Sequence, residues 1–244
     1  MAKLRVPSLQ HLARNWRDDP IQIKKLLIRI ARNPPQFNYD PIQTALRDML
    51  VFGVPYDQIV NGLTLGVRRQ WALKIYLDLL PMIYGHFKDI QPDFVLSVDK
   101  RFYPVGRDLF VPFEPPLIYG LNGTIHFPWF IFWRRNPITD VRLSLFISLV
   151  DELLLQDPDL ENVKFEILDF SAPFANGPRQ LVVTDAKDVA RVEPNQKKRM
   201  LEKFAAGYVL ALEELSHAAR ERSDESAKDK ALDRPNESPD MFDQ

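Results

Sequence analysis

The sequence predicts an α+β protein: a helical N-terminal module packed on a mixed, mainly antiparallel sheet domain with two helices, followed by a disordered C-terminal tail. Residues 1–90 show helical periodicity and proline-led helix starts, which indicate the module. Residues 91–217 change to short strands punctuated by proline, and residues 218–244 are charged and poor in apolar side chains. We therefore expect a basic helical module over residues 1–90, an α+β domain over 91–217 and a tail over 218–244.

The helices of the first 90 residues are marked by local start and stop signals. Asp19-Pro20 offers an N-cap followed by proline at the first helical position, and Asn33-Pro34-Pro35 ends the helix that begins there. Asp40-Pro41 repeats the start signal for a second helix, which Gly53 closes. A short helix over residues 55–62 and a long, mostly apolar helix over residues 67–87 are expected to follow.

The segment Asn122–Arg135 contains the core strand of the second domain. Five of the seven residues from 127 to 133 are aromatic. A strand this apolar is covered on both faces, because neither face can be left in water. We therefore expect a central strand over residues 124–133.

The remaining elements of the second domain follow from strand patterns and caps. Thr139 is the expected N-cap of a helix over residues 140–155, which Asp157-Pro158 stops. A final helix is expected to begin at Pro194, with an apolar stripe at helical spacing. The other strands are expected near residues 94–98, 107–113, 117–119, 163–170 and 180–184.

Composition excludes several classes of protein. The chain has no cysteine, which rules out disulfides, thiolate metal sites and a cysteine nucleophile, and which fits a reducing cytoplasm. The basic start has no apolar run after it, so no secretory signal is expected. The longest uncharged window, residues 115–133, contains three prolines and two glycines, so no membrane span is expected there.

Charge is distributed unevenly along the chain. Residues 1–90 carry 13 Lys and Arg against 7 Asp, whereas residues 91–215 carry 14 basic residues against 18 acidic ones. Such asymmetry favours either an anionic partner for the N-terminal module or docking of the two parts on each other. The candidate nucleic-acid contacts are five basic residues, namely Lys25, Arg29, Arg32, Arg68 and Arg69.

No compact catalytic motif is present in the sequence. The four histidines are far apart and lack a metal-binding spacing, and the glycine patterns of phosphate loops and nucleophile elbows are missing. The leading interpretation is therefore a cytoplasmic, non-enzymatic binding or adaptor protein without a cofactor. Its partner is either another protein or a nucleic acid.

The alternative is a Mg²⁺-dependent nuclease. Asp169 and Asp185 lie at the ends of predicted strands, and Glu152 lies on the helix before them. The order of strands and helices is similar to that of RNase H-like and restriction-endonuclease-like nucleases, which implies a carboxylate-held metal ion. Ser171 stands where the restriction-type motif has lysine, and an ion pair between Asp169 and Arg179 is the competing, purely structural interpretation.

Overall fold

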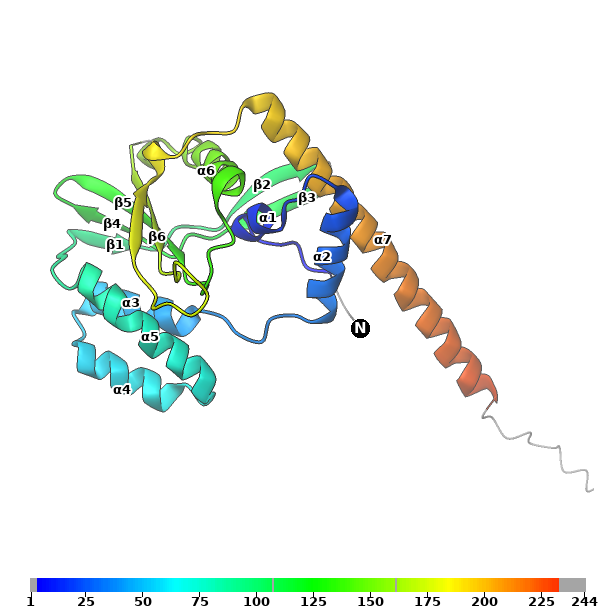
Figure 1. The fold of residues 1–244 in the computed structure, drawn as a ribbon, viewed down its shortest axis with the longest axis horizontal. Helices are drawn as coiled ribbons and strands as arrows, with labels where there is room; N and C mark the ends of the chain where they lie inside the picture. The colour runs from blue at the N-terminus through cyan, green and yellow to red at the C-terminus, as the bar shows by residue number, and fades with distance from the viewer. Residues whose placement is uncertain (1–3, 107, 161, 233–244) are drawn as a thin grey trace, which may run out of the picture.

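The computed structural model describes the backbone of residues 4–106, 108–160 and 162–232. Within those residues, seven α-helices surround a mixed five-stranded sheet, and two further strands form a separate antiparallel ribbon (Figure 1). This arrangement confirms the predicted α+β class. None of the helices in the described part is long and apolar enough to cross a membrane.

The N-terminal helices begin and end close to the predicted residues. The Asp19 side chain accepts a hydrogen bond of 2.8 Å from the Ile21 amide, as an N-cap does. Gly53 has φ of +61° and closes its helix in the left-handed conformation that glycine allows. The helices are α1 (Leu9–Asn15), α2 (Pro20–Arg32), α3 (Asp40–Phe52), α4 (Tyr56–Gly66), α5 (Gln70–Phe87), α6 (Asp140–Leu154) and α7 (Pro194–Leu232).

The main sheet has the strand order β1-β4-β5-β6-β7, and the β2–β3 ribbon lies apart from it. Only the β5–β6 pair is parallel, and α6 is the crossover that joins these two strands. The other pairs are antiparallel, so the sheet is mixed and mainly antiparallel. The strands are β1 (Phe94–Leu96), β2 (Arg101–Gly106), β3 (Leu109–Phe113), β4 (Ile118–Leu121), β5 (Thr124–Ile131), β6 (Lys164–Asp169) and β7 (Val182–Asp185).

Strand β5 is covered on both faces, as its aromatic residues predict. Phe127 and Trp129 belong to a core shared with α1, α2, α6, α7 and the β2–β3 ribbon. Phe130 and the following Phe132 belong to a second core, shared with α3, α4 and α5. The alternation of a strand therefore sends consecutive aromatic side chains into two different cores.

The N-terminal helices pack on the sheet in two groups, one in each core. Helix α2 lies along α7, whereas α3, α4 and α5 gather on the other side of the sheet (Figure 1). Both cores meet at β5, so the sheet joins the two groups. The division of the chain at residues 90 and 217 stays a prediction.

Three features differ from the sequence-based expectations. Helix α1 has no counterpart among the individual helices predicted. Strand β2 has no counterpart among the predicted strands; its side chains alternate between exposed and buried through Pro104, and it pairs with β3 in a ribbon whose register shifts between Pro104 and Gly106. Helix α7 continues to Leu232, past the predicted start of the tail at residue 218. The rest of the predicted tail, residues 233–244, lies outside the described residues.

Candidate nucleic-acid interface

The structure divides the five predicted basic residues between two places. Lys25, Arg29 and Arg32 lie exposed on α2, and Arg68 and Arg69 lie exposed in the connection from α4 to α5. Arg32 is 3.8 Å from Glu214 of α7, and Arg69 Nη1 donates to the Gln36 carbonyl oxygen at 2.7 Å. The α2 and α4–α5 groups are thus separate candidate contacts.

Arg17 lies within range of the charges of three further arginines, Arg14, Arg29 and Arg142. Arg14 comes from α1, Arg17 from the connection to α2, and Arg142 from the first turn of α6. The Arg17 guanidinium donates to the carbonyl oxygens of Arg14 and Trp16 at the end of α1, at 3.0 and 2.6 Å. We call Arg14, Arg17, Arg29 and Arg142 the arginine cluster.

The charges of the arginine cluster act on one another. Burial lowers the pKa of Arg14, and the nearby charge of Arg29 lowers it further. Burial also lowers the pKa of Arg17, with added repulsion from Arg142, Arg14 and Arg29. No carboxylate of the described residues forms an ion pair with any of the four arginines. The cluster is therefore a concentration of positive charge that an anion would stabilise.

An aromatic ring supports one member of the cluster. The guanidinium carbon of Arg14 lies 5.0 Å from the centroid of Trp133, in the range of a cation–π contact. Trp133 in turn meets the His11 ring edge-on, with centroids 5.7 Å apart. These contacts hold Arg14 in place before any ligand arrives, which reduces the side-chain entropy lost on binding.

Sequence reasoning identified Arg29 but missed the other three arginines of the cluster. Arg17 and Arg142 are 125 positions apart, and the packing of α1 against α6 brings their charges within range of each other. The spacing of three between Arg14 and Arg17 is a local signal, but a common one that does not by itself indicate a site.

The three carboxylates of the nuclease alternative have separate partners. Glu152 accepts from Tyr103 and pairs with Lys197, which ties α6 to β2 and α7. Asp185 accepts from the Lys187 amide at 2.9 Å and caps a short 3₁₀ turn. In the β6–β7 ladder Asp169 lies opposite Val182, three positions from Asp185, a separation of about 10 Å along a strand.

Asp169 has a structural role different from the predicted one. Its carboxylate accepts from Asn136 Nδ2 at 2.8 Å and from the Ser171 amide at 2.9 Å. The predicted ion pair with Arg179 is wrong, because Arg179 is directed at Asp78 of α5, with Nε 3.2 Å from Oδ2. Across the described residues, no group of three or more His, Asp or Glu side chains is arranged to hold a metal ion.

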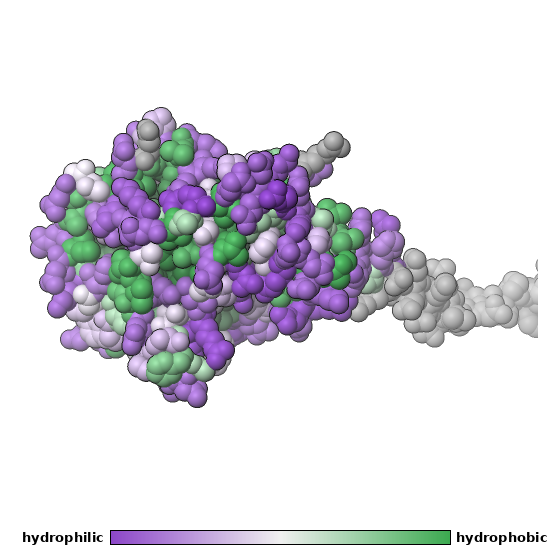
Figure 2. All heavy atoms as spheres, turned by 45° about the horizontal axis from the view of Figure 1, so that its top comes forward, coloured by the Kyte–Doolittle hydropathy of each residue, from purple (hydrophilic) through white to green (hydrophobic). Residues whose placement is uncertain are grey.

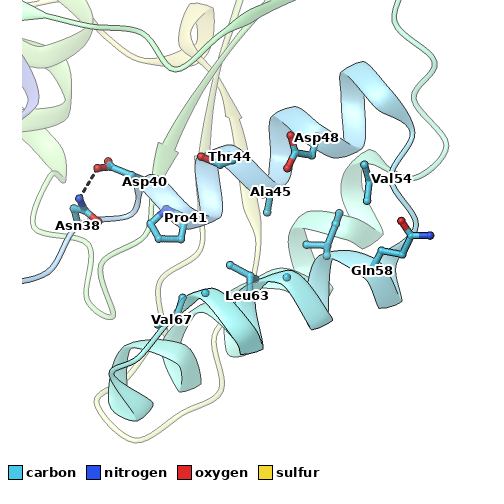
Figure 3. Close-up of a pocket in the computed structure, with 13 residues that line it drawn as sticks. Asn38, Asp40, Pro41, Thr44, Ala45, Asp48, Val54, Gln58, Leu63 and Val67 are labelled. Atoms are coloured by element: carbon cyan, nitrogen blue, oxygen red, sulfur yellow. Dashed lines mark hydrogen bonds between the residues drawn. The ribbon is translucent and has the colours of Figure 1, made fainter.

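A groove lies between α3 and α4, away from the arginine cluster (Figure 3). It has a volume of about 560 Å³. A second hollow of about 440 Å³ shares Asn38, Pro41, Gly66 and Val67 with it and continues to Arg68 and Arg69. Sequence reasoning did not predict this groove, because its shape depends on how two helices pack.

Comparison with protein-family models gives no match. Comparison with curated proteins likewise finds no similar sequence. The candidate function therefore has to be argued from the residues of this chain.

Proposed function

We propose that the protein is a non-enzymatic binding or adaptor protein that associates with nucleic acid through the arginine cluster and Lys25. The observation that supports this proposal is the cluster itself: four arginines from four parts of the fold with no ion-pair partner among the described residues. Guanidinium groups match phosphate oxygens in geometry and charge. Contacts of this kind bind the backbone and carry no base sequence preference.

The first experiment measures binding of the full chain to a labelled single strand and to a duplex by fluorescence anisotropy over a range of salt concentrations. We expect affinity to fall steeply with salt. Arg29→Gln and Arg142→Gln should each weaken binding to all sequences alike and reduce the slope of log K against log salt by about one. Lys88→Gln, at an exposed lysine beyond α5, is the matched control and should change neither quantity.

The second group of basic residues is tested in the same assay. If Arg68→Gln with Arg69→Gln leaves the slope unchanged, the interface is confined to the arginine cluster and α2. If the slope falls, the bound strand extends to the α4–α5 connection. No binding of either nucleic acid at low salt would remove this proposal and leave a protein partner as the ligand.

Two further statements remain predictions. The alternative of a metal-dependent nuclease with Glu152, Asp169 and Asp185 has no support from the geometry. Cleavage of nucleic acid that requires added metal and is lost in Asp169→Asn would be needed to support it. A cytoplasmic location is compatible with the absence of cysteine, and imaging of a tagged chain in its host would test it.

A further inference from the structure

The groove between α3 and α4 follows one face of each helix. Its lining on α3 recurs at positions 41, 44, 45 and 48, and its lining on α4 runs from Gln58 to Gly66. Spacings of three and four keep these residues on one side of each helix. Eight residues of α4 correspond to about 12 Å, or a little over two helical turns. The groove is therefore as long as two turns of a third helix.

Two glycines form an open part of the groove. Gly62 and Gly66 are one turn apart on α4, and a Cβ atom added at either would meet nothing within 4 Å. Neither has the positive φ that favours glycine. Glycine inside a helix costs about 1 kcal/mol relative to alanine. The packing of the described residues gives no reason for these glycines, and the space beside them allows another chain to approach the α4 backbone closely.

The groove has acidic side chains along its α3 side and basic side chains at one end. Asp40 and Asp48 lie on the α3 side, and Asp48 forms no ion pair with the described residues. Arg68 and Arg69 lie in the hollow that continues the groove past Gly66. Between these ends the buried side chains Ile59 and Leu63 are apolar (Figure 3).

Large apolar side chains are exposed on the same helices. Leu65, three residues after Gly62, is 87% exposed, and Phe52 at the end of α3 is 73% exposed. The face drawn in Figure 2 shows apolar residues in several separate groups between polar ones. Neither Leu65 nor Phe52 lines the groove itself, but exposed apolar residues on the helices that form a groove are typical of a surface that a partner covers.

We propose that the α3–α4 groove binds a basic amphipathic helix of a partner protein. Its narrow apolar side packs on Gly62, Gly66 and Leu63, and its lysine or arginine side chains meet Asp40 and Asp48. The negative end of its helix dipole lies toward Arg68 and Arg69. This is the helix-in-groove mode of recognition, and it gives the protein a second site, built from different helices than the arginine cluster.

The test uses two synthetic probes and the full chain. Both probes are 18-residue helix-forming peptides with alanine and leucine at spacings of three and four; one carries lysine along its flanks and the other carries glutamate. Isothermal titration calorimetry measures their affinities. We expect the lysine peptide to bind at least tenfold more tightly than the glutamate peptide, and Asp48→Asn to reduce that difference.

Gly62→Leu tests the place of binding. A Cβ atom there meets nothing within 4 Å, and Gly62 lines the groove, so we expect the leucine side chain to occupy it and to cause at least a tenfold loss of lysine-peptide affinity without a lower melting temperature. Gly85→Leu on α5 is the matched control, since a Cβ at Gly85 also meets nothing within 4 Å and Gly85 lies outside the groove. The affinity of this variant for the lysine peptide should equal that of the unchanged chain.

Nucleic-acid binding is measured on the same variants, and we expect Gly62→Leu to leave it unchanged. Four results would overturn the proposal. These are no binding of either peptide, equal binding of both, lysine-peptide binding that survives Gly62→Leu, and loss of nucleic-acid binding in Gly62→Leu. The last result would assign the groove to the nucleic acid instead.

Discussion

Arg179 shows how a single buried charge joins three parts of the fold. Its side chain is only 4% exposed, and Nη1 donates to the carbonyl oxygens of Phe132 and Phe170, both at 2.9 Å. These carbonyls follow the ends of β5 and β6, where the sheet no longer supplies partners. Asp78 of α5 provides the opposite charge at 3.2 Å. The guanidinium therefore holds the ends of the parallel strand pair against α5.

We expect Arg179→Met to lower the free energy of unfolding by about 2 kcal/mol, because it leaves the Phe170 carbonyl without this donor and Asp78 without its counter-charge, whereas the Phe132 carbonyl keeps the Tyr39 hydroxyl as a donor. Urea denaturation measures the change. Arg135→Met, at an exposed arginine three residues after Phe132, is the control and should cost less than 0.5 kcal/mol. A loss below 1 kcal/mol in Arg179→Met would mean that water replaces the guanidinium.

His11 makes stability depend on pH. Burial, together with the neighbouring charge of Arg14, lowers the pKa of His11 from 6.5 to about 4. The unfolded chain therefore binds a proton at higher pH than the folded one. The stability contributed by neutral His11 is complete above pH 6.5 and is lost as the pH falls toward 4.

We expect the free energy of unfolding to fall by about 1–2 kcal/mol between pH 6.5 and 5 on account of His11 alone. His11→Gln should remove this part of the pH dependence, and His217→Gln, at an exposed histidine of α7, should not. Urea titrations at both pH values supply the comparison. An unchanged pH dependence in His11→Gln would assign the effect to other groups.

At the scale of elements, α2 and α7 approach each other closely at one glycine. A Cβ on Gly207 of α7 would lie 2.7 Å from Ile23 Cβ and 2.8 Å from the Pro20 carbonyl oxygen of α2. Backbone and a branched side chain cannot move aside as the end of a flexible side chain can. The absence of a side chain at Gly207 is thus what lets the two helices pack.

Gly207→Ala should consequently destabilise the protein, by about 1–3 kcal/mol, although alanine is the better helix former. Gly85→Ala on α5 meets no neighbour and should instead stabilise by about 0.5–1 kcal/mol. Thermal unfolding of the two variants side by side gives changes of opposite sign. A stabilising Gly207→Ala would show that the helices separate without cost.

At the scale of the whole molecule, β5 is the element that unites the fold. Its residues contribute to both cores, so neither group of helices is packed without it. Helix α4 is the contrasting case, because among its residues only Ile59 and Leu63 are buried apolar side chains. Stability is therefore distributed unevenly.

Native-state hydrogen exchange should reflect this distribution. We expect the hydrogen-bonded amides of β5 to exchange only through global unfolding, and those of α4 through a local opening of lower free energy. Exchange measured over a series of low urea concentrations distinguishes the two processes, since global exchange depends strongly on urea. Equal protection in β5 and α4 would contradict the role given to β5.

The sequence by itself determined the α+β class, the central aromatic strand and the starts of most helices. Asp19-Pro20 and Gly53 act through the backbone of the few residues beside them, so their effects can be read locally. Thr139 stands at the N-cap position of α6, as expected, but its side chain makes no capping hydrogen bond. Strand β2 could not be predicted from such local signals. Its proline is tolerated only because the strand lies in a separate two-stranded ribbon.

The tertiary structure alone decided which charges meet. The Asp169 carboxylate accepts a hydrogen bond from Asn136 and does not pair with Arg179, and the charge of Arg142 acts on Arg17. Both interactions follow from the path of the chain around α6. The α3–α4 groove likewise depends on the packing of two helices and on the space beside Gly62 and Gly66. Side-chain charges act through space over several ångströms, and the distance between two residues in space does not follow from their separation in the sequence.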